Sequence, residues 1–510
     1  MRIIPYQPEL STPLPVVQGN VDYLNFEETL KRIDELLYLS GIESRFVEGR
    51  VEEYLNDAVE EARSKGKEPR HISNKELAGV QIHARRALRC TLARELTGES
   101  LRDFSCRLAE SFLFQWFCEI DRLDVIKVPG KSTLQRYENM VSEETVRGLI
   151  DQLSRQAATP STEALPQPLE LKDAIDLQSY FIDTSCVKAN IHFPVDWVLL
   201  RDAARTLMLA VKLIRREGLK NRMEPPGEFL KRMNKLSIEM THTRRKKDSK
   251  KQRKRVLRLM KRLMKVIDAH ARRHRDLLEQ NWPQTQWSEA QARQVIDRID
   301  GIREQLPAAI KQAHERIIGG RQVPSKEKIL SLYEPDVHPV LRHKTGEAVE
   351  FGNTILIGEV AEGVIVDWQF FQDQAPSDSR LVEQSVQRFE NIFEGILPKS
   401  LGADRGFHSA KNRRILERCE IYNGICPVNV NELHDRMEDE EFAKLQTRRN
   451  QTEPRLAILK NNFLGRPMRS KGFIHRAGHV AWAVLAHNLW VIARLPRAEE
   501  EVEHPEKIPA

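Results

Sequence analysis

One acidic residue at the end of a short buried strand limits the folds that this chain can adopt. Asp404 follows the run 396–401 and lies within the turn Gly402-Ala403-Asp404-Arg405-Gly406-Phe407. Burying an isolated carboxylate costs several kcal/mol unless something compensates for its charge. A divalent cation is one such compensation, because hard cations take carboxylate oxygens and keep positions open for phosphate. The sequence therefore favours a fold that brings further acids close to Asp404.

Two other segments carry acids that could meet at the same place. Residues 177–182 have the pattern of a strand, and Asp183 follows them. Farther along, Arg449, Glu453 and Lys460 fall within roughly 40° of one another on one face of a helix. An acid between two cations suits a metal ligand with phosphate contacts beside it. An ordinary salt-bridged surface face has the same pattern, and spacing alone does not separate the two interpretations.

Taken together, these residues resemble the Asp-Asp-Glu (DDE) transposases of bacterial insertion sequences. Within them the chain is similar to the group with a Tyr-x2-Arg-x3-Glu-x6-Lys signature, of ISNCY type. Arg449, Glu453 and Lys460 match that signature, whereas Gln446 stands at the tyrosine position. The resemblance covers roughly residues 75–495 and implies a catalytic domain of the RNase H-like, retroviral integrase superfamily.

The resemblance also implies a metal-dependent reaction on DNA. Two Mg²⁺ or Mn²⁺ ions would serve the attacking and leaving oxygens of a phosphodiester, and there is no Cys/His cluster of zinc-ligand spacing. The reaction would be cleavage at the ends of an insertion element and strand transfer into target DNA. The implied metal ligands and catalytic residues are Asp183, Asp404 and Glu453. The implied phosphate contacts near them are Arg449, Lys460 and Arg405.

Two glutamates compete for the position of the third acid. Glu440 lies 36 residues after Asp404, a spacing similar to that of retroviral integrases. Glu453 lies 49 residues after Asp404, with cations on its own face and an apolar run behind it, whereas Glu440 belongs to the acidic run 438–441. Pro454 disfavours helical geometry at Glu453, so a helix starts or kinks there. We expect Glu453 to be the third acid.

Composition indicates a globular protein with a polyanionic partner. The 510 residues carry a net charge of +7, which favours nucleic acid. Six scattered cysteines without CxxC pairing indicate reduced thiols in a cytoplasm. The resemblance to bacterial transposases implies a nucleoid-associated prokaryotic location. The apolar run 481–493 is too short to span a bilayer and is expected to be a buried helix, so no membrane partner is expected.

The N-terminal third has a helical pattern. Residues 1–73 are expected to form a helical lead-in, and residues 74–156 a helical DNA-binding domain with a break at 97–100. Ser132-x-x-Gln135 has the pattern of a capping box that opens a helix. A plain helical bundle fits the same residues, but the resemblance favours a helix that enters a DNA groove. Its DNA contacts would be Lys131, Thr133, Gln135 and Arg136. A linker rich in Pro, Ser and Thr is expected at 157–170.

A basic helical insertion is expected at residues 194–329. Residues 244–265 contain 13 Lys or Arg and one acid, and Val256, Leu259, Leu263 and Val266 repeat at helical spacing. A second helix opened by Ser288 would pack against this one. Such a run is usually a solvated face, but like charges repel and a phosphate backbone relieves the repulsion. The expected DNA contacts are Lys250, Lys251, Arg253, Lys254 and Arg258.

The order of the remaining elements predicts a multidomain α+β protein. After the strand that precedes Asp183 come the insertion, a hairpin at 354–371, a helix at 380–397 and the strand before Asp404. Without the insertion, this is the order of an RNase H-like fold. A mixed sheet with helices is therefore expected from residues 171–193 and 330–495, followed by a tail at 496–510.

Three functions remain for comparison. The first is a transposase that acts as a homodimer or higher oligomer on double-stranded DNA, namely terminal inverted repeats and target. The second is an RNase H-like nuclease or resolvase that does not join strands. The third is a DNA-binding regulator with a decayed site, against which the intact set of acids argues.

Overall fold

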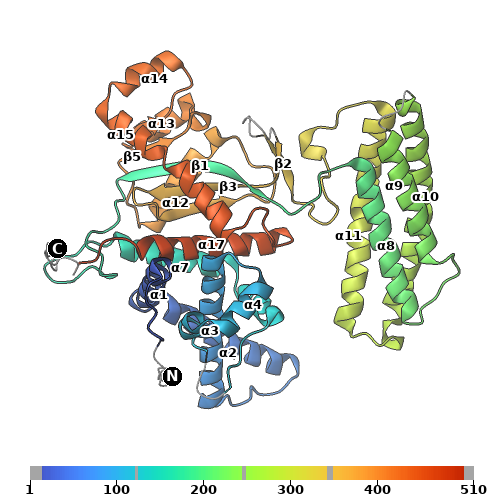
Figure 1. The fold of residues 1–510 in the computed structure, drawn as a ribbon, viewed down its shortest axis with the longest axis horizontal. Coiled ribbons are helices and arrows are strands. Elements are labelled where there is room, and N and C mark those ends of the chain that lie inside the picture. The colour runs from blue at the N-terminus through green and yellow to red at the C-terminus, as the bar shows by residue number, and fades with distance from the viewer. Residues whose placement is uncertain (1–13, 121–124, 244–247, 342–348, 499–510) are drawn as a thin grey trace.

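The structure is a computed structural model that describes residues 14–120, 125–243, 248–341 and 349–498. Parts of the expected lead-in and tail, and four cations of the basic run at 244–247, lie outside these residues. Figure 1 shows a helical layer below a sheet, with a long helical bundle standing beside them. The chain thus has the mixed α+β architecture that the sequence predicts.

The N-terminal layer consists of helices whose ends follow the local sequence. Ser73, Ser100 and Ser142 cap three of them, each accepting a backbone N–H of the first turn. Gly98 has a left-handed φ of 63° at the end of one helix, so the predicted break at 97–100 is confirmed. The helices are α1 (Val21–Leu39), α2 (Ile42–Ser64), α3 (Asn74–Thr97), α4 (Leu101–Glu110), α5 (Phe112–Phe117), α6 (Lys131–Glu138) and α7 (Glu143–Ala158).

The predicted capping box at the start of α6 is wrong. The helix begins at Lys131, two residues earlier than the pattern indicates, and Gly130 is its N-cap without a side-chain hydrogen bond. Ser132 therefore lies inside the first turn, where its hydroxyl is not placed to cap the helix. Gly130, in an extended conformation, precedes α6 in place of a serine cap.

The described strands form one six-stranded mixed sheet. Its central strand β1 pairs antiparallel with β3 and parallel with β5, and β5 pairs parallel with β6. The predicted hairpin at 354–371 is confirmed by the antiparallel pairing of β3 with β4, and β2 pairs with the other end of β3. The strands are β1 (Ser179–Lys188), β2 (His338–Leu341), β3 (Val349–Val360), β4 (Ile365–Phe370), β5 (Ser400–Ala403) and β6 (Tyr422–Ile425).

Helices of the C-terminal half connect and flank these strands. The helix predicted at 380–397 is present but shorter, as α12, because it ends before Gly395, which has a φ of 94°. The helices are α12 (Val382–Ile392), α13 (Ala410–Arg418), α14 (Val430–Met437), α15 (Glu440–Arg449), α16 (Thr452–Ile458) and α17 (Phe473–Ile492). Among the described residues, no helix has the length and apolarity needed to cross a bilayer.

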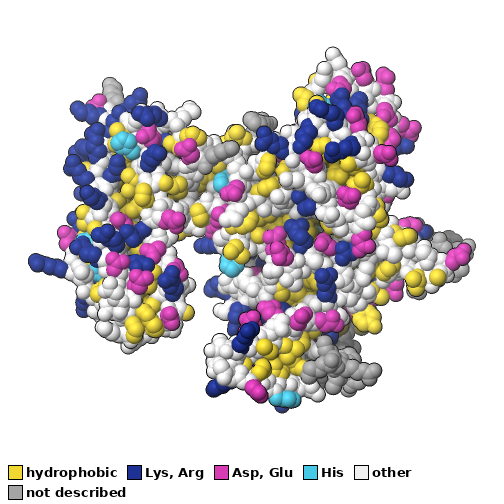
Figure 2. Space-filling model, turned by 180° about the vertical axis from the view of Figure 1, so that it is seen from behind, with side chains coloured by type: hydrophobic (Ala, Val, Ile, Leu, Met, Phe, Trp, Pro, Cys, Tyr) yellow, Lys and Arg dark blue, Asp and Glu magenta, His cyan; other side chains and the backbone are white. Residues whose placement is uncertain are grey.

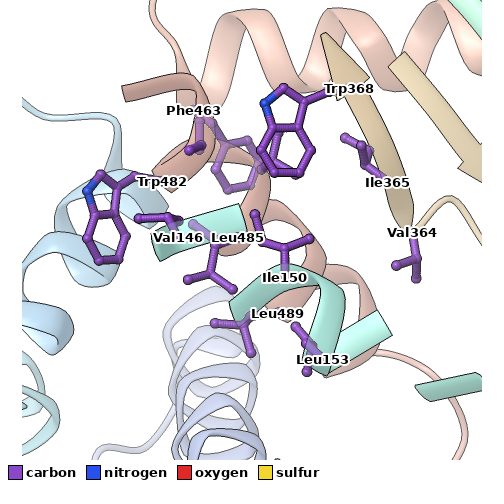
Figure 3. Close-up of a cluster of buried hydrophobic side chains, with 14 of the residues drawn as sticks. Val146, Ile150, Leu153, Val364, Ile365, Trp368, Phe463, Trp482, Leu485 and Leu489 are labelled. Carbon is purple, nitrogen blue, oxygen red and sulfur yellow. The ribbon is translucent and has the colours of Figure 1, made fainter. Parts of the chain in front are cut away.

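Helix α17 joins the helical layer to the sheet. Figure 3 shows its side chains Leu485 and Leu489 beside Ile150 of α7, with Trp482 next to Val146 of α7 and Trp368 of β4 close by. These residues belong to one buried core that extends from α1 to α17. The apolar run predicted to be a buried helix is therefore confirmed, and it is the shared wall of two layers.

A buried amide satisfies the outer side of β4. Asn488 of α17 is fully buried; its Oδ1 accepts the N–H of Ile365 at 2.9 Å, and its Nδ2 donates to the Ile365 carbonyl at 2.7 Å. Because β4 pairs only with β3, these two backbone groups would otherwise have no partner in the sheet. Asn488 thus connects α17 to the edge of the sheet and gives hydrogen-bond partners to backbone groups that an apolar side chain would leave unpaired.

The insertion folds as a four-helix bundle with a core of its own. It interrupts the sheet between β1 and β2 and consists of α8 (Asp196–Arg216), α9 (Pro226–Thr243), α10 (Ser249–Asn281) and α11 (Glu289–Ala313). The predicted start of α11 is confirmed, since Ser288 and Gln291 form a reciprocal capping box. Figure 1 shows the bundle to one side of the sheet, connected by extended segments.

The apolar stripe predicted for the basic helix is only partly right. Val256 is buried, but Leu259 and Val266 of α10 are 38% and 46% exposed. The buried side of the helix is lined instead by residues that include Met260 and Met264. The three neighbouring helices of the bundle contact this methionine-rich side, which the spacing of leucine and valine alone does not reveal.

We predict that the two cores unfold separately. Leu485→Ala should destabilise the main core by about 2–5 kcal/mol, the range for truncating a buried leucine, and leave the bundle unchanged. Ile299→Ala, a truncation in the bundle core, should do the reverse. Calorimetric unfolding measures both transitions. A joint shift of both transitions in either variant would show that the two cores form one cooperative unit.

Candidate active site

The parallel pairing of β1 with β5 brings two predicted acids together. Ile182 on β1 is paired with Ala403 on β5. The next residue along the chain is an aspartate in both cases: Asp183, still within β1, and Asp404, just after the end of β5. Because the pairing is parallel and in this register, the two aspartates are neighbours across the strands, although 220 positions separate them in the chain.

Asp404 lies close to a further acid that the sequence did not single out. Its Oδ1 accepts the N–H of Gly406 at 2.8 Å. A Cβ at Gly406 would lie 2.8 Å from Oδ2 of Asp378 and 3.0 Å from Oδ1 of Asp404, so glycine leaves room for both carboxylates. Thr184 donates its hydroxyl to Oδ1 of Asp378 at 2.9 Å. Asp378 opens the short 3-10 turn Asp378–Arg380 before α12, where no local sequence pattern distinguishes it from other acids between helices and strands.

A cavity of about 1040 Å³ opens over these acids. Glu453 of α16 lines it, together with cations from three different elements. The structure therefore brings to one cavity all the residues that were predicted for the catalytic centre and its nearby phosphate contacts. They are Asp183, Asp404, Glu453, Arg449, Lys460 and Arg405.

The single helix expected for Arg449, Glu453 and Lys460 is not present. Arg449 ends α15, Glu453 lies in the first turn of α16, and Lys460 lies in the π-helical turn Leu459–Phe463. Pro454 explains the break, because proline has no N–H to donate and its ring clashes with the carbonyl four residues earlier. The predicted start or kink at this place is thus confirmed, and the three side chains still line one cavity.

A buried glutamate anchors the break between the two helices to the sheet. Glu359 of β3 is 2% exposed; its Oε1 accepts from Arg448 at 3.1 Å and from the Thr452 hydroxyl at 2.8 Å. Arg448 also donates to the carbonyls of Val360 and Ala361. Sequence analysis missed Glu359 and Arg448. A glutamate inside the mostly apolar end of β3, residues 355–360, was the available signal.

Other side chains hold the two nearby cations in position. Gln446 is buried; its Nε2 donates to the Gly424 carbonyl of β6 at 2.7 Å, and its Oε1 accepts from Nε of Arg449 at 3.1 Å. Lys460 donates to the hydroxyl of Ser185 on β1 at 2.9 Å. The glutamine at the signature's tyrosine position thus ties Arg449 to the sheet.

Burial and neighbouring charge act together on Asp183. Burial raises its pKa to about 7, and the negative charges of Asp404 and Asp378 act in the same direction. The backbone N–H of Thr184 and the charge of Arg449 oppose this shift in the pKa. A cation beside these acids would favour the ionised form of Asp183.

The donor set fits a hard divalent cation by its chemistry. Asp183, Asp404 and Glu453 offer only oxygen ligands, and like charges already raise the pKa of Asp183. In the described part of the chain, however, no three His, Cys, Asp or Glu side chains are already grouped around a common ion position. Binding of an ion would therefore require these carboxylates to turn toward it.

Glu440, the competing third acid, lies elsewhere. Its side chain is 82% exposed and forms an ion pair with Lys444 one turn along α15. It is not among the residues that line the cavity. The geometry thus separates Glu440 from Asp404, although their spacing in sequence is the shorter one.

The residues predicted for the DNA-binding helix lie on α6, away from the catalytic cavity. Lys131 and Gln135 line a second cavity, of about 690 Å³. Arg136 donates to the hydroxyl of Thr133 at 3.2 Å. The far end of α6 is fixed to α17, because the indole of Trp482 donates to the carbonyl that ends the helix.

The cations predicted on the insertion lie along α10. Lys250, Lys251 and Arg258 are exposed and form no ion pair with any described acid, and Lys254 is half-buried. Arg253 is different, since its guanidinium lies over the ring of Trp197 at 5.3 Å. Figure 2 shows Lys and Arg side chains gathered over the upper part of the bundle. The positive charge is thus concentrated at one end of the insertion.

Comparison with known proteins gives one match. Residues 340–489 match the family model described as the transposase DDE domain. The matched segment contains Asp404 and Glu453, while Asp183 precedes it across the bundle. No curated protein and no solved structure matches the chain.

We predict that removing the charge of Asp183 stabilises the metal-free protein at high pH. A carboxyl whose pKa rises from 3.8 to about 7 on folding binds its proton more tightly in the folded state. Its contribution therefore lowers the free energy of unfolding as pH rises from about 4 to 7, by up to about 4 kcal/mol at about 1.4 kcal/mol per pKa unit. Asp183→Asn should thus be more stable than wild type at pH 8 in EDTA, with a smaller gain at pH 5.

Denaturant titration at both pH values measures this difference. Glu440→Gln is the matched control, because the exposed Glu440 carboxylate has its pKa lowered by Lys444 and should give no such gain. An equal effect of Asp183→Asn at pH 5 and pH 8 would contradict the assigned charge balance.

Proposed function

We propose that this chain, which carries a transposase DDE domain at residues 340–489, cuts DNA at the ends of an insertion element and joins them to target DNA. The observation that carries the proposal is that Asp183 and Asp404 directly follow the paired residues Ile182 and Ala403 of β1 and β5 and line one cavity with Glu453. Two cations, Arg449 and Lys460, line the same cavity. This combination suits a phosphodiester, because cations can hold its charged oxygens while the acids support attack on its phosphorus.

The topology supports an RNase H-like catalytic domain made from residues 171–193 and 330–495. Three strands, β1, β3 and β4, pair antiparallel, a helix follows, and β5 and β6 then add in parallel. In this proposal the bundle is an insertion between the first and second strands of that domain. The helical region 74–156 would bind the element end.

The side chains of the cavity have separate tasks in this proposal. Asp183, Asp404 and Glu453 would hold Mg²⁺ or Mn²⁺, which supplies polarisation of the phosphate and activation of the attacking oxygen. Asp183 must give up its proton before it can act as a ligand, because its pKa is raised to about 7. Arg449 and Lys460 would orient the scissile phosphate through its non-bridging oxygens, a contact that carries no sequence information.

The same side chains would serve both steps of the reaction, cleavage at the element end and strand transfer to the target. In the first, a water attacks the phosphodiester at the element end and leaves a 3′-hydroxyl. In the second, that 3′-hydroxyl attacks a target phosphodiester in line, and the broken bond leaves a new 3′-hydroxyl in the target. Two copies of the chain would be needed to hold two element ends at once, which agrees with a dimer or higher oligomer.

One assay distinguishes the candidate functions. The protein is mixed with a plasmid target and a duplex from the inverted repeats that flank its gene, in Mg²⁺ or in EDTA. An uncut duplex that extends past the element end reports cleavage, and a duplex pre-cleaved at the 3′ end reports joining. Covalent joining that requires Mg²⁺ supports the transposase. Cleavage without joining indicates a nuclease or resolvase, and binding without either reaction indicates a regulator. Unchanged cleavage in EDTA would contradict a divalent-metal site.

We expect Glu453→Gln to abolish cleavage and joining while DNA binding remains. The substitution keeps the size of a side chain that lines the catalytic cavity but removes its charge. Glu440→Gln is the matched control and should be nearly silent, because Glu440 is exposed on the surface of α15. Cleavage rates and binding isotherms of both variants on the same duplex are the measurement. The opposite ranking would move the active site to the acidic run 438–441.

We also expect the basic end of the bundle to bind DNA phosphate. Reversing Lys250, Lys251 and Arg258 to Glu should weaken binding and reduce the slope of log affinity against log salt by up to about 0.9 per lost contact. Folding should persist, because these side chains are exposed. Arg293→Glu, a change on α11 at a cation already paired with Asp297, should leave the slope nearly unchanged. An unchanged slope in the triple variant would show that this end is merely solvated.

A further inference from the structure

The second cavity lies between the N-terminal helices and the C-terminal part of the chain. One wall comes from α4 and α6, and the other from the segment 464–472 between the π-helical turn and α17. It shares no lining residue with the catalytic cavity among the residues described.

Four exposed cations line this cavity without a neutralising partner. None of them forms an ion pair with an acid in the described ranges. Among the other charged groups there, Arg94 pairs with Glu95 and Glu138, and Glu99 pairs with Arg107. One acid, Asp103, accepts a hydrogen bond from Ser100 and offsets part of the positive charge. The four cations are Arg102, Lys131, Arg469 and Lys471. The cavity therefore offers uncompensated positive charge.

The segment that carries two of these cations is firmly held. The hydroxyl of Ser470 lies 2.8 Å from Nδ1 of His479, whose Nε2 lies 3.1 Å from Oε2 of the buried Glu95. Met468 is fully buried, and its N–H donates to the carbonyl of Lys188 on β1 at 2.9 Å. Met468 and Ser470 contact the protein. Arg469 and Lys471, which alternate with them, line the cavity.

The opposite wall is fixed to the same region. Gly98, at the end of α3, lies so near the π-helical turn that a Cβ there would be 2.6 Å from the carbonyl oxygen of Asn462. Oδ1 of Asn139, just after α6, lies at hydrogen-bond distance, 2.9 Å, from Nδ1 of His475. The two walls thus contact each other directly, so the cavity is already formed before a ligand binds.

The segment 464–472 also reaches the catalytic cavity. Arg466 lines that cavity, and Arg469 lines the second one three residues later. Three residues span at most about 11 Å of extended chain. Along one DNA strand, base pairs advance about 3.4 Å each. One duplex could therefore contact both cavities within roughly three base pairs.

We propose that the second cavity binds the sugar–phosphate backbone of the element end whose scissile phosphate lies in the catalytic cavity. Arg469 and Lys471 hold the backbone from the catalytic side, and Lys131 and Arg102 hold it from the helical side. In this arrangement α6 contributes phosphate contacts that set the register of the DNA, instead of reading bases from a groove. The inference rests on the proposed function, since it assumes that an element end occupies the catalytic cavity.

The test uses the full-length protein in EDTA and a labelled duplex from the inverted repeat beside its gene. Single neutral methylphosphonate linkages are placed in turn over the first ten positions from the end. Arg469→Ala with Lys471→Ala is compared with wild type, and Lys399→Ala with Arg414→Ala is the matched control of exposed cations that line neither cavity. Both double variants should fold normally, because all four side chains are exposed.

For the cavity variant, Arg469→Ala with Lys471→Ala, we expect the slope of log affinity against log salt to be smaller by up to about 1.8. This corresponds to about 0.9 for each lost phosphate contact. Raising salt from 50 to 200 mM would then weaken its binding about tenfold less than that of wild type. A neutral linkage near the end should weaken wild type and the control but have no further effect on the cavity variant. An unchanged slope, or the same sensitivity to each linkage as wild type, would overturn the proposal.

The outcome is separable from that of the proposed function. If wild type joins DNA in Mg²⁺ but the cavity variant keeps the wild-type slope and linkage pattern, the second cavity is not a backbone site and the transposase remains. If the linkage pattern depends on Arg469 and Lys471 but no cleavage or joining occurs, the backbone site remains and the transposase activity is wrong.

Discussion

Repulsion between carboxylates is the constraint on which the centre of this protein depends. The register of β1 against β5 places Asp183 beside Asp404, and Asp378 adds a third negative charge nearby. A fold that only had to be stable would not bury these charges together. A divalent cation of the kind proposed above would compensate this repulsion, because it favours the ionised form of all three carboxylates.

The packing of the main core holds in place the strands and helices that carry these carboxylates. Helix α17 packs the helical layer against the sheet, and Asn488 satisfies the outer side of β4. Glu359 anchors the break between α15 and α16, so Glu453 faces the cavity even though proline interrupts the helix. The bundle is different, because it folds around its own core and is connected through the end of β1. It can thus present its basic end without disturbing the centre.

Much of this could be predicted from local sequence, and the failures have local causes. The hairpin, the mixed sheet and the capped start of α11 follow from turn residues, β-branched runs and Ser288. The start of α6 and the buried side of α10 were predicted imprecisely, because α6 starts after an extended glycine and three neighbouring helices contact α10. Asp378 and Arg448 were missed, since neither stands in a distinctive local pattern. Glu359 was missed although it stands in the mostly apolar end of β3.

The sequence by itself determined which residues could do the chemistry: acids after short strands, and cations spaced around a glutamate. It also favoured Glu453 over Glu440, because cations and an apolar run surround Glu453, but it could not place either glutamate beside the aspartates. The tertiary structure decided this, since Glu453 lines the cavity with both aspartates while Glu440 points to solvent. It also decided that segment 464–472 borders two cavities at once. Contacts between residues hundreds of positions apart depend on strand register and helix packing, which no local pattern encodes.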